Sequence, residues 1–360
     1  MFKLPFALPS LTLPFGRKSR EAFGLDIGSS AVKVVQLRQS GSSYSLASLA
    51  TVALPPEAIT EGTIKEPAPV IEAIREATSS AGVRSRDAVV GLSGRELIIK
   101  KVQIPDIPVK ELDDAIQLEA EHHIPFAIDE VFLDYHIVGR HDGALDLILV
   151  AVKKSKVTDC MAVVDESGFN PVVVDVDSFA LGNQYELNHP GVGDEAVALV
   201  DIGASTMKTN VMRGGSSIFA RDIPFGGNNY TQAIAQHLRV PLDQAEAAKL
   251  GKDVGVPWDS IVPALEAVSR ELSLEIQRTF DYFASTAESE RIGKIVLAGG
   301  CSLLPGLADY LASTWSIPVE VSRPFDRIEV GGGHTEAVAA AGPALAVAVG
   351  LGLRFAGDKT

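Results

Sequence analysis

The chain has 360 residues, of which 46% are hydrophobic and 22% charged, so it can bury sizeable cores and is expected to form two or more domains. Its net charge of −14 argues against a general nucleic-acid-binding surface, which usually carries a basic patch. Its two cysteines, Cys160 and Cys301, lack metal-like spacing and suit a reducing compartment without a disulfide framework or zinc site.

The N-terminal tail, residues 1–20, is apolar, contains three prolines and ends in basic residues. A signal peptide is disfavoured because the basic residues follow the apolar ones and no small-residue cleavage site is present. Two interpretations stay open: an unstructured terminus, or an anchor for a membrane surface or a partner. No stretch of the chain approaches the roughly 20 apolar residues of a membrane span.

The next part of the chain predicts a domain that begins with three strands. These expected strands cover residues 22–26, 31–37 and 44–53. Apolar spacing in residues 70–80 predicts a helix that ends at Gly82, and residues 88–92 predict a further strand.

Residues 93–176 predict a compact α+β module inserted into this first domain. The expected order is a strand (95–104), a helix (109–123), two strands (131–138 and 145–152), a helix (153–167) and a strand (171–176). The turn at His141-Asp142-Gly143 indicates that the two middle strands form a hairpin.

The remainder of the chain alternates strands with helices, which implies α/β architecture. A helix is expected at 177–188, and strands at 197–201, 206–213 and 216–224. Further helices are expected at 225–238, 242–249, 260–286, 303–314 and 343–353, with strands at 294–298 and 319–321 between them.

A sharp turn follows the first strand, in the segment Asp26-Ile27-Gly28-Ser29-Ser30-Ala31-Val32-Lys33. Gly28 permits a backbone turn that a side chain would hinder. Ser29 and Ser30 offer backbone N–H groups and hydroxyls above the turn, and Lys33 lies at a spacing that lets it lean back over the same place.

The same pattern returns in Asp201-Ile202-Gly203-Ala204-Ser205-Thr206-Met207-Lys208, in register with the first. One Asp-x-Gly turn is weak evidence, but two copies, each between strand-like runs, predict two similar domains that face one another. Two such turns pointing into one cleft would clamp an anion such as a phosphate. The aspartates Asp26 and Asp201 could hold Mg²⁺ through water.

A third motif, Ala298-Gly299-Gly300-Cys301-Ser302, follows another buried strand. Its glycines would let a flat ring lie against bare backbone. A helix starting near Ser302 or Leu303 would add hydrogen-bond donors and a partial positive charge.

The order of two phosphate-type turns and a Gly-Gly turn resembles the actin-like ATPase superfamily over almost the whole chain. This resemblance implies an α/β, actin-like (ribonuclease H-like) fold with two similar domains around a nucleotide cleft and an inserted α+β subdomain. It implies ATP and Mg²⁺ as cofactors. Asp26 and Asp201 would lie near the Mg²⁺, while Gly28–Ser30 and Gly203–Thr206, with Lys33 and Lys208, would hold phosphates.

The resemblance also implies residues around the base and the sugar. Gly299, Gly300 and Ser302 would line the adenosine pocket, and Gly226 and Gly227 resemble the glycine pair that precedes a helix beside the nucleotide. Glu246 and Lys249 resemble a ribose-contacting pair; the alternative for these two is a solvated ion pair one helical turn apart.

Within the superfamily, residues 93–176 look like the SHS2-type subdomain of FtsA and of the PilM family. Glu119-Ala120-Glu121-His122-His123-Ile124-Pro125-Phe126 followed by Phe132-Leu133-Asp134-Tyr135 is similar to the PilM pattern, and residues 354–360 show no amphipathic helix of the FtsA type. The expected domains are 21–92 with 177–195, the inserted 93–176, and 196–360.

The PilM resemblance implies a cytoplasmic, ATP-binding scaffold of the type IV pilus machinery at the inner face of the inner membrane. It also implies that a groove between the first domain and the inserted module binds the N-terminal cytoplasmic tail of the inner-membrane protein PilN. An FtsA-like division filament protein is the first alternative, and a small-molecule kinase of the same fold is the second.

The chain offers no convincing general base, so we expect slow or partner-dependent ATP hydrolysis at most. His122 and His123 are adjacent on a helix, point in different directions and have no third ligand nearby. We therefore expect them to be a helix C-terminal pair, favoured there by the helix dipole.

Overall fold

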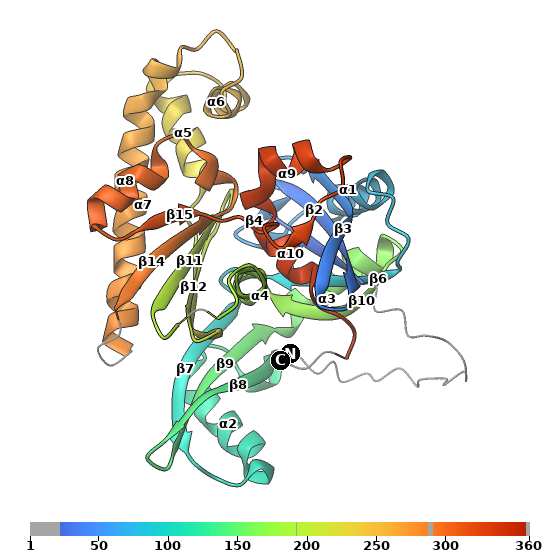
Figure 1. Cartoon of the computed structure of the whole chain (residues 1–360), viewed down its shortest axis with the longest axis vertical. Helices are drawn as coiled ribbons and strands as arrows, with labels where there is room; N and C mark the ends of the chain where they lie inside the picture. Colours follow the sequence, from blue (N-terminus) through green and yellow to red (C-terminus); the bar gives the residue numbers. More distant parts are fainter. Residues whose placement is uncertain (1–21, 192, 287–290, 358–360) are drawn as a thin grey trace.

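The computed structural model describes residues 22–191, 193–286 and 291–357, so the predicted tail at residues 1–20 lies outside it. Two large sheets form two domains, and a smaller sheet forms an inserted module that projects from them (Figure 1). The expected α/β class, with two similar domains and an insertion, is confirmed.

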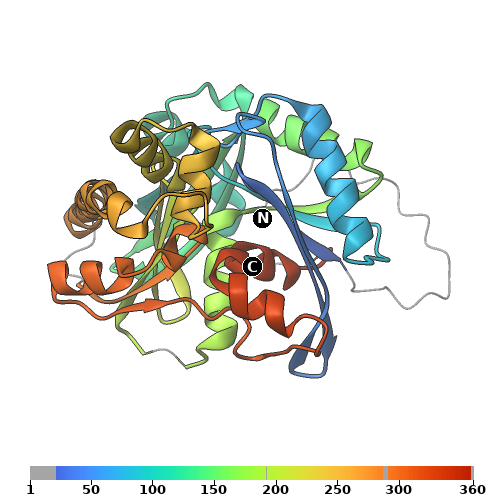
Figure 2. The ribbon, with the colours of Figure 1, turned by 90° about the horizontal axis from the view of Figure 1, so that it is seen from above.

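The first domain is built on a six-stranded sheet. In spatial order its strands are β10 (Asn170–Val176), β6 (Asp87–Leu92), β1 (Phe23–Ile27), β2 (Ala31–Ser40), β3 (Ser43–Ala53) and β16 (Ile328–Glu329). Strands β1, β2 and β3 are antiparallel, whereas β6 runs parallel to β1. Helix α1 (Pro67–Ser80) covers one face and α10 (Ala346–Gly352) the other, with the sheet between them in Figure 2. A short hairpin, β4 (Ile59–Thr60) and β5 (Thr63–Ile64), follows β3.

The second domain repeats this arrangement on a five-stranded sheet. Its strands, in spatial order, are β13 (Ser216–Ile223), β12 (Met207–Arg213), β11 (Ala196–Ile202), β14 (Ile292–Ala298) and β15 (Val319–Val321). Its helices are α5 (Gly227–Leu238), α6 (Leu242–Lys249), α7 (Trp258–Thr286) and α8 (Leu307–Trp315). As in the first domain, the leading strand β11 pairs antiparallel on one side and parallel on the other.

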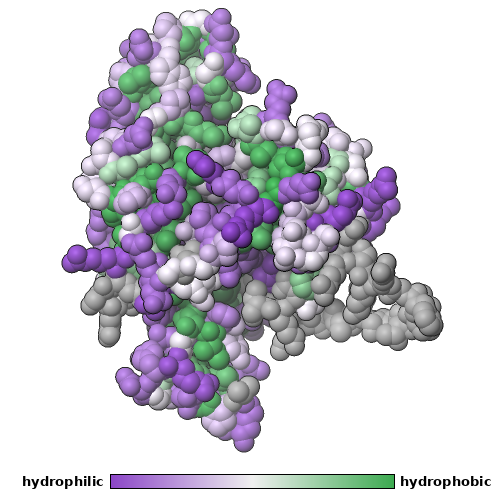
Figure 3. All heavy atoms as spheres, viewed as in Figure 1, coloured by the Kyte–Doolittle hydropathy of each residue, from purple (hydrophilic) through white to green (hydrophobic). Residues whose placement is uncertain are grey.

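The inserted module has one three-stranded antiparallel sheet, in the order β7 (Leu97–Pro105), β9 (Ala144–Lys153) and β8 (Val131–His141). Helix α2 (Val109–His123) spans the predicted residues, and its buried face packs Leu112 and Ile116 against Leu147 and Leu149 of β9. A 3₁₀ turn, η1 (Ile128–Glu130), leads into β8. Figure 3 shows hydrophilic residues over much of the free lower end of this module.

The predicted range 93–176 for the module is too long at its end. Helix α3 (Lys154–Glu166) and strand β10 belong to the first domain, because β10 pairs in parallel with β6. Val157, Val163 and Val174 lie in the same hydrophobic core as Leu25 and Ile74. The apolar patterns of α3 and β10 were correct, but the sheet they join is set by long-range pairing.

The predicted range 196–360 for the second domain is also too long. After β15 the chain returns to the first domain, where Phe325 and Ile328 pack against Val35 and Leu37. Helix α4 (Asp177–Asn188) lies between the domains, in contact with α10 and with β11 and β12. The expected final helix at 343–353 is a 3₁₀ turn, η3 (Gly342–Leu345), followed by α10, and it is preceded by α9 (Thr335–Ala341), which was not predicted.

The expectation that no stretch resembles a membrane span was wrong by length and composition. Residues Thr335–Gly352 are long and apolar enough to cross a membrane, but half of this window is buried inside the fold. The stretch contains Pro343, and in α10 every residue from Ala346 to Leu351 is buried. Its hydrophobicity is therefore explained by its place in the core.

The helix expected at 303–314 begins later than predicted. Residues Gly300–Leu303 form a 3₁₀ turn, η2, and α8 starts at Leu307 after Pro305 and Gly306. Gly306 has a positive φ of 78°, which interrupts the helix. The Gly-Gly turn is thus followed by a 3₁₀ turn instead of the expected α-helix N-terminus.

Candidate functional site

The first turn joins β1 to β2. The Gly28 N–H donates to the Ala31 carbonyl at 3.1 Å. Because Asp26 and Lys33 are register partners across the hairpin, Lys33 Nζ lies 2.9 Å from Asp26 Oδ2. Burial would raise the pKa of Asp26, but the charges of Lys33 and Lys208 and the hydrogen bond from Lys33 together hold it below its ordinary value.

The second turn joins β11 to β12 and has the same geometry. The Gly203 N–H donates to the Thr206 carbonyl at 3.0 Å, and Lys208 Nζ lies 3.0 Å from Asp201 Oδ2. Lys208 differs from Lys33 because it also pairs with Asp177 Oδ2, at 3.2 Å. Burial opposes its charge, but Asp201, Asp177 and Asp26 raise the pKa of Lys208 well above its ordinary value.

The two turns face each other across the domains. The hydroxyls of Ser29 and Ser205, 176 positions apart in the chain, are 2.5 Å from one another. Ser30, next to Ser29, is exposed, while the Thr206 side chain is buried. A phosphate group placed between the turns would have to replace the contact between the two serine hydroxyls.

The Gly-Gly turn lies against the second phosphate-type turn. Gly299 has a φ of 82°, and a Cβ on it would lie 2.4 Å from the Ile202 carbonyl oxygen and 2.8 Å from Asp201 Oδ1. A Cβ on Gly300, by contrast, would meet nothing within 4 Å. Ser302 is buried and its hydroxyl donates to the Gly299 carbonyl at 2.7 Å, so this side chain shapes the turn.

The glycine pair at the start of α5 packs onto the same turn. A Cβ on Gly226 would lie 2.5 Å from the Gly203 carbonyl oxygen, and the Gly227 N–H donates to that oxygen at 2.9 Å. The Ala204 carbonyl accepts from the Asn228 N–H at 2.8 Å. The start of α5 therefore fixes the backbone of the second turn.

The pair Glu246 and Lys249 lies beside this helix start. Lys249 is buried and its Nζ contacts Glu246 Oε2 at 2.6 Å, the Gly227 carbonyl at 3.1 Å and Thr231 Oγ1 at 2.9 Å. The alternative, an ion pair one helical turn apart, is formed, and it is solvated on the side of Glu246 but not on that of the buried Lys249. Thr231, which also donates to Glu246, was missed because no local pattern marks it.

A further acidic residue at the site, Asp177, was also missed. It is the first residue of α4, is 5% exposed and lies directly after the parallel strand β10. Burial raises its pKa, Lys208 opposes this rise and Asp26 adds to it. Its place after the carboxyl end of a parallel strand, where ligands commonly bind, was a signal that could have found it.

The residues present fit a phosphate-bound cation held through water. Among the described residues, no group of three or more His, Cys, Asp or Glu side chains could hold a metal ion directly. The carboxylates of Asp26 and Asp201 stand at the two turns and keep an oxygen besides the one that each lysine binds. This arrangement suits Mg²⁺, which usually retains several waters.

His122 and His123 lie in the last turn of α2, where a helix C-terminal pair was expected. His123 Nε2 contacts Glu119 at 2.8 Å, and His122 Nδ1 contacts the Leu118 carbonyl.

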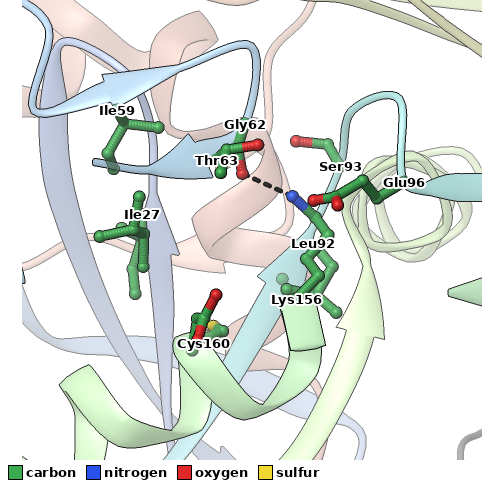
Figure 4. A pocket seen from close by; sticks show the side chains of 12 residues that line it. Ile27, Ile59, Gly62, Thr63, Leu92, Ser93, Glu96, Lys156 and Cys160 are labelled. Atoms are coloured by element: carbon green, nitrogen blue, oxygen red, sulfur yellow. Dashed lines mark hydrogen bonds between the residues drawn. The ribbon is translucent and has the colours of Figure 1, made fainter. Parts of the chain in front are cut away.

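A separate pocket lies in the first domain, beside the loop that leads into the module (Figure 4). Its cavity of about 40 Å³ is lined by the β4–β5 hairpin, the end of β6, the following loop and α3. Lys156 reaches up from α3 and donates to the Gly62 carbonyl, shown dashed in Figure 4. Burial lowers the pKa of Lys156, an effect that Glu96 opposes.

Comparisons with solved structures define the class of protein. The fold is that of MreB5 of Spiroplasma citri bound to ADP, with a TM-score of 0.55, 11% identity, and coverage of 94% of this chain and 96% of that one. Ethanolamine utilization protein EutJ from Carboxydothermus hydrogenoformans gives a TM-score of 0.57 with 18% identity over 95% and 90% of the two chains. The molecule therefore has the actin-like ATPase fold.

The family follows from the sequence. The model of the family "Type IV pilus assembly protein PilM" matches residues 24–356, and the chain belongs to that family. A solved chain of a PilM–PilN type IV pilus biogenesis complex superposes with a TM-score of 0.84 and 31% identity, over 93% of this chain and 98% of that one.

The cell division protein FtsA is a more remote relative. The protein of Neisseria meningitidis is 23% identical over 78% of this chain and 77% of its own. That of Bacillus subtilis is 24% identical over 62% of this chain, and the match spans only 56% of the Bacillus protein.

Proposed function

We propose that this protein binds ATP with Mg²⁺ between its two domains and holds the N-terminal tail of a PilN-like inner-membrane protein as a scaffold of type IV pilus assembly. It would then work in the cytoplasm, at the inner face of the inner membrane. The observation that carries the nucleotide part is the meeting of the two Asp-x-Gly turns at Ser29 and Ser205, with the Gly299–Gly300 turn beside them.

The phosphates would lie between the two turns. Backbone N–H groups and the hydroxyls of Ser29, Ser30 and Ser205 would donate to them, and Lys33 would add a positive charge. Bound Mg²⁺ would neutralise phosphate charge, with its water ligands held by Asp26 and Asp201. The adenosine would lie over Gly300, the open position of its turn, with Glu246 facing the ribose.

Hydrolysis, if it accompanies binding, would involve Asp177. This carboxyl is buried beside Lys208 and its raised pKa favours proton uptake from an attacking water. We expect a slow rate because Lys208 already occupies one of its oxygens. Fast steady-state phosphate release by the isolated protein would contradict this expectation.

The PilN-like tail would bind where the first domain meets the inserted module. The support is the similarity to the chain solved in a PilM–PilN complex and the pocket beside the loop that leads into the module. Ile59, Ile64 and Leu92 give the pocket an apolar wall, and Lys156, Glu96 and Asp159 give it polar groups. Because the cavity of about 40 Å³ has room for only a few waters, an extended peptide would have to lie across its mouth or widen it.

Isothermal calorimetry tests both parts of the proposal. Asp26→Ala and Asp201→Ala should each weaken Mg-ATP binding at least about tenfold, because each removes a carboxylate that orients the cation's water. Asp106→Ala, which removes a surface ion pair with Arg140 in the module, is the control and should bind as wild type does. Unchanged affinity in both cleft variants would remove the site assignment.

A short PilN N-terminal peptide, titrated with and without Mg-ATP, tests the partner. One saturable site per chain supports the scaffold. Absent peptide binding in a protein that still binds ATP would favour the alternative, an FtsA-like filament protein, to which the similarity of the FtsA sequences points. Nucleotide-dependent polymerisation would then be measured by sedimentation.

A further inference from the structure

Strand β13, at one edge of the second domain's sheet, contacts the start of the inserted module. Asp222 on β13 is the register partner of Lys208 on β12, so both side chains lie on one face of the sheet. Asp222 Oδ2 accepts a hydrogen bond from the Gly94 N–H at 2.7 Å. Gly94 belongs to the connecting loop, residues 93–96, that links β6 of the first domain to β7 of the module.

The other side of the connecting loop is packed against the first domain. Gly94 has a φ of 101°, and a Cβ on it would lie 2.6 Å from the Glu61 carbonyl oxygen. Gly62 has a φ of 77°, and a Cβ on it would lie 2.7 Å from the Ser93 carbonyl oxygen. The loop and the β4–β5 turn thus pack backbone against backbone, so a shift of the loop toward the turn would displace the turn.

This β4–β5 turn is also a wall of the pocket in Figure 4. Lys156 donates to the Gly62 carbonyl, and Gly62, Ser93 and Glu96 line the cavity. A displacement of the connecting loop would therefore reshape the pocket.

A second contact joins the module to the second domain farther along β7. Lys100 Nζ donates to the Tyr282 hydroxyl of α7 at 3.1 Å and lies 5.4 Å from the centre of the Tyr282 ring. The Arg221 guanidinium, one residue before Asp222, lies 5.2 Å from the same ring centre. The second domain thus holds the chain at two points: at Gly94, just before β7 begins, and at Lys100 within β7.

Lys208 connects this attachment to the cleft. Its ammonium binds Asp201 at the second turn and Asp177 at the start of α4, and its strand partner is Asp222. A Cβ on Gly91 would lie 2.0 Å from Asp177 Oδ1, which places this carboxyl against the end of β6, three residues before Gly94. Two sets of contacts therefore link the second turn to the connecting loop. One runs through Lys208 and Asp222, and the other through Asp177 and Gly91.

We propose that Asp222 couples the nucleotide cleft to the inserted module: it ties the connecting loop to the second domain, so that movement of this domain moves the loop and reshapes the pocket. The tie itself is independent of the proposed function, whereas its control by nucleotide rests on that function.

Hydrogen exchange of the full chain, followed by mass spectrometry of peptides covering residues 93–105, tests the tie. Without nucleotide, Asp222→Ala should speed exchange at the connecting loop about tenfold or more, because a buried amide loses a charged acceptor. Asp222→Asn keeps a neutral acceptor of the same shape and should give a smaller rise. Asp106→Ala, in the same module but away from the second domain, should exchange as wild type does.

The same peptides with Mg-ATP test the coupling. In wild type, ATP should change exchange at residues 59–64 and 93–105, and in Asp222→Ala this response should fall at least about threefold. Wild-type exchange at the loop in Asp222→Ala would overturn the tie, and a full ATP response in that variant would overturn the coupling. If calorimetry shows no ATP binding, the proposed function fails, while the measurement without nucleotide still decides the tie.

Discussion

The two Asp-x-Gly turns share a sequence pattern but differ in their surroundings. In the first, the Lys33 side chain is 20% exposed and forms an ion pair with one carboxylate, that of Asp26. In the second, the Lys208 side chain is 10% exposed and bridges two carboxylates, Asp201 and Asp177. The comparison teaches that equivalent lysines have diverged: Lys33 is the one available to a ligand, and Lys208 holds the strand, the turn and helix α4 together.

The largest expected effect comes from Lys208→Met. This change leaves two buried carboxylates without their cation, and we expect it to lower the free energy of unfolding by about 3–5 kcal/mol. Urea unfolding followed by circular dichroism measures it. Lys33→Met should cost less than half as much, because Lys33 is more exposed and Lys208 still acts on Asp26. Equal losses in the two variants would show that the turns are energetically equivalent.

The Gly-Gly turn beside the second turn provides a matched pair of alanine variants. Gly299→Ala should destabilise the protein by about 2–4 kcal/mol, because its positive φ and the nearby backbone exclude a Cβ. Gly300→Ala faces open space and should change stability by less than about 0.5 kcal/mol, while weakening nucleotide binding if the base lies there. Thermal unfolding with and without Mg-ATP separates the two effects.

Lys33→Met should weaken Mg-ATP binding about tenfold to a hundredfold, since a charged hydrogen bond to phosphate contributes about 1.5–3 kcal/mol. Calorimetry measures the affinity, and the melting temperature checks that the variant is folded. Lys101→Met, which removes an ion pair with Asp146 in the module, is a control of the same chemistry and should bind as wild type does. Wild-type affinity in Lys33→Met would mean that Lys33 contacts only Asp26.

The smallest expected effect concerns pH. Burial raises the pKa of Asp222 to about 6 from an ordinary 3.8, with Asp177 adding to the rise and Gly94, Lys208 and Lys156 opposing it. The folded state holds the Asp222 proton more tightly than the unfolded state does. The stabilisation from this group is therefore complete below the pKa of the unfolded state and is lost as pH rises through the folded-state pKa of about 6. Stability should therefore fall by about 1–3 kcal/mol from this group between pH 4 and 7.

Asp222→Asn should flatten this part of the pH dependence, measured as urea midpoints at pH 4.5 and 7.5. Asp26→Asn is the matched comparison from the first turn. The pKa of Asp26 in the folded state lies below its ordinary value. The stabilisation from this group is therefore present above the pKa of the unfolded state and is lost only as pH falls through the pKa of the folded state. It should leave the slope between these two pH values unchanged, and the same flattening in both variants would contradict the assignment to Asp222.

The sequence by itself determined the two turns and most of the elements around them. An Asp and a Lys seven residues apart can become register partners across a tight hairpin, and both pairs are formed. Helices α2 and α6 begin and end at the predicted residues, and the repeated pattern implied two similar domains. These features depend on local geometry and on the period of apolar residues.

Only the tertiary structure decided which elements belong together. The patterns of α3, β10 and α10 show an apolar face but not the sheet that covers it, so their domain was assigned wrongly. Asp177, Thr231 and Asp222 acquire their roles from Lys208, Lys249 and Gly94, which lie far away in sequence. Such contacts are selected by burial and long-range pairing, which a local pattern does not encode.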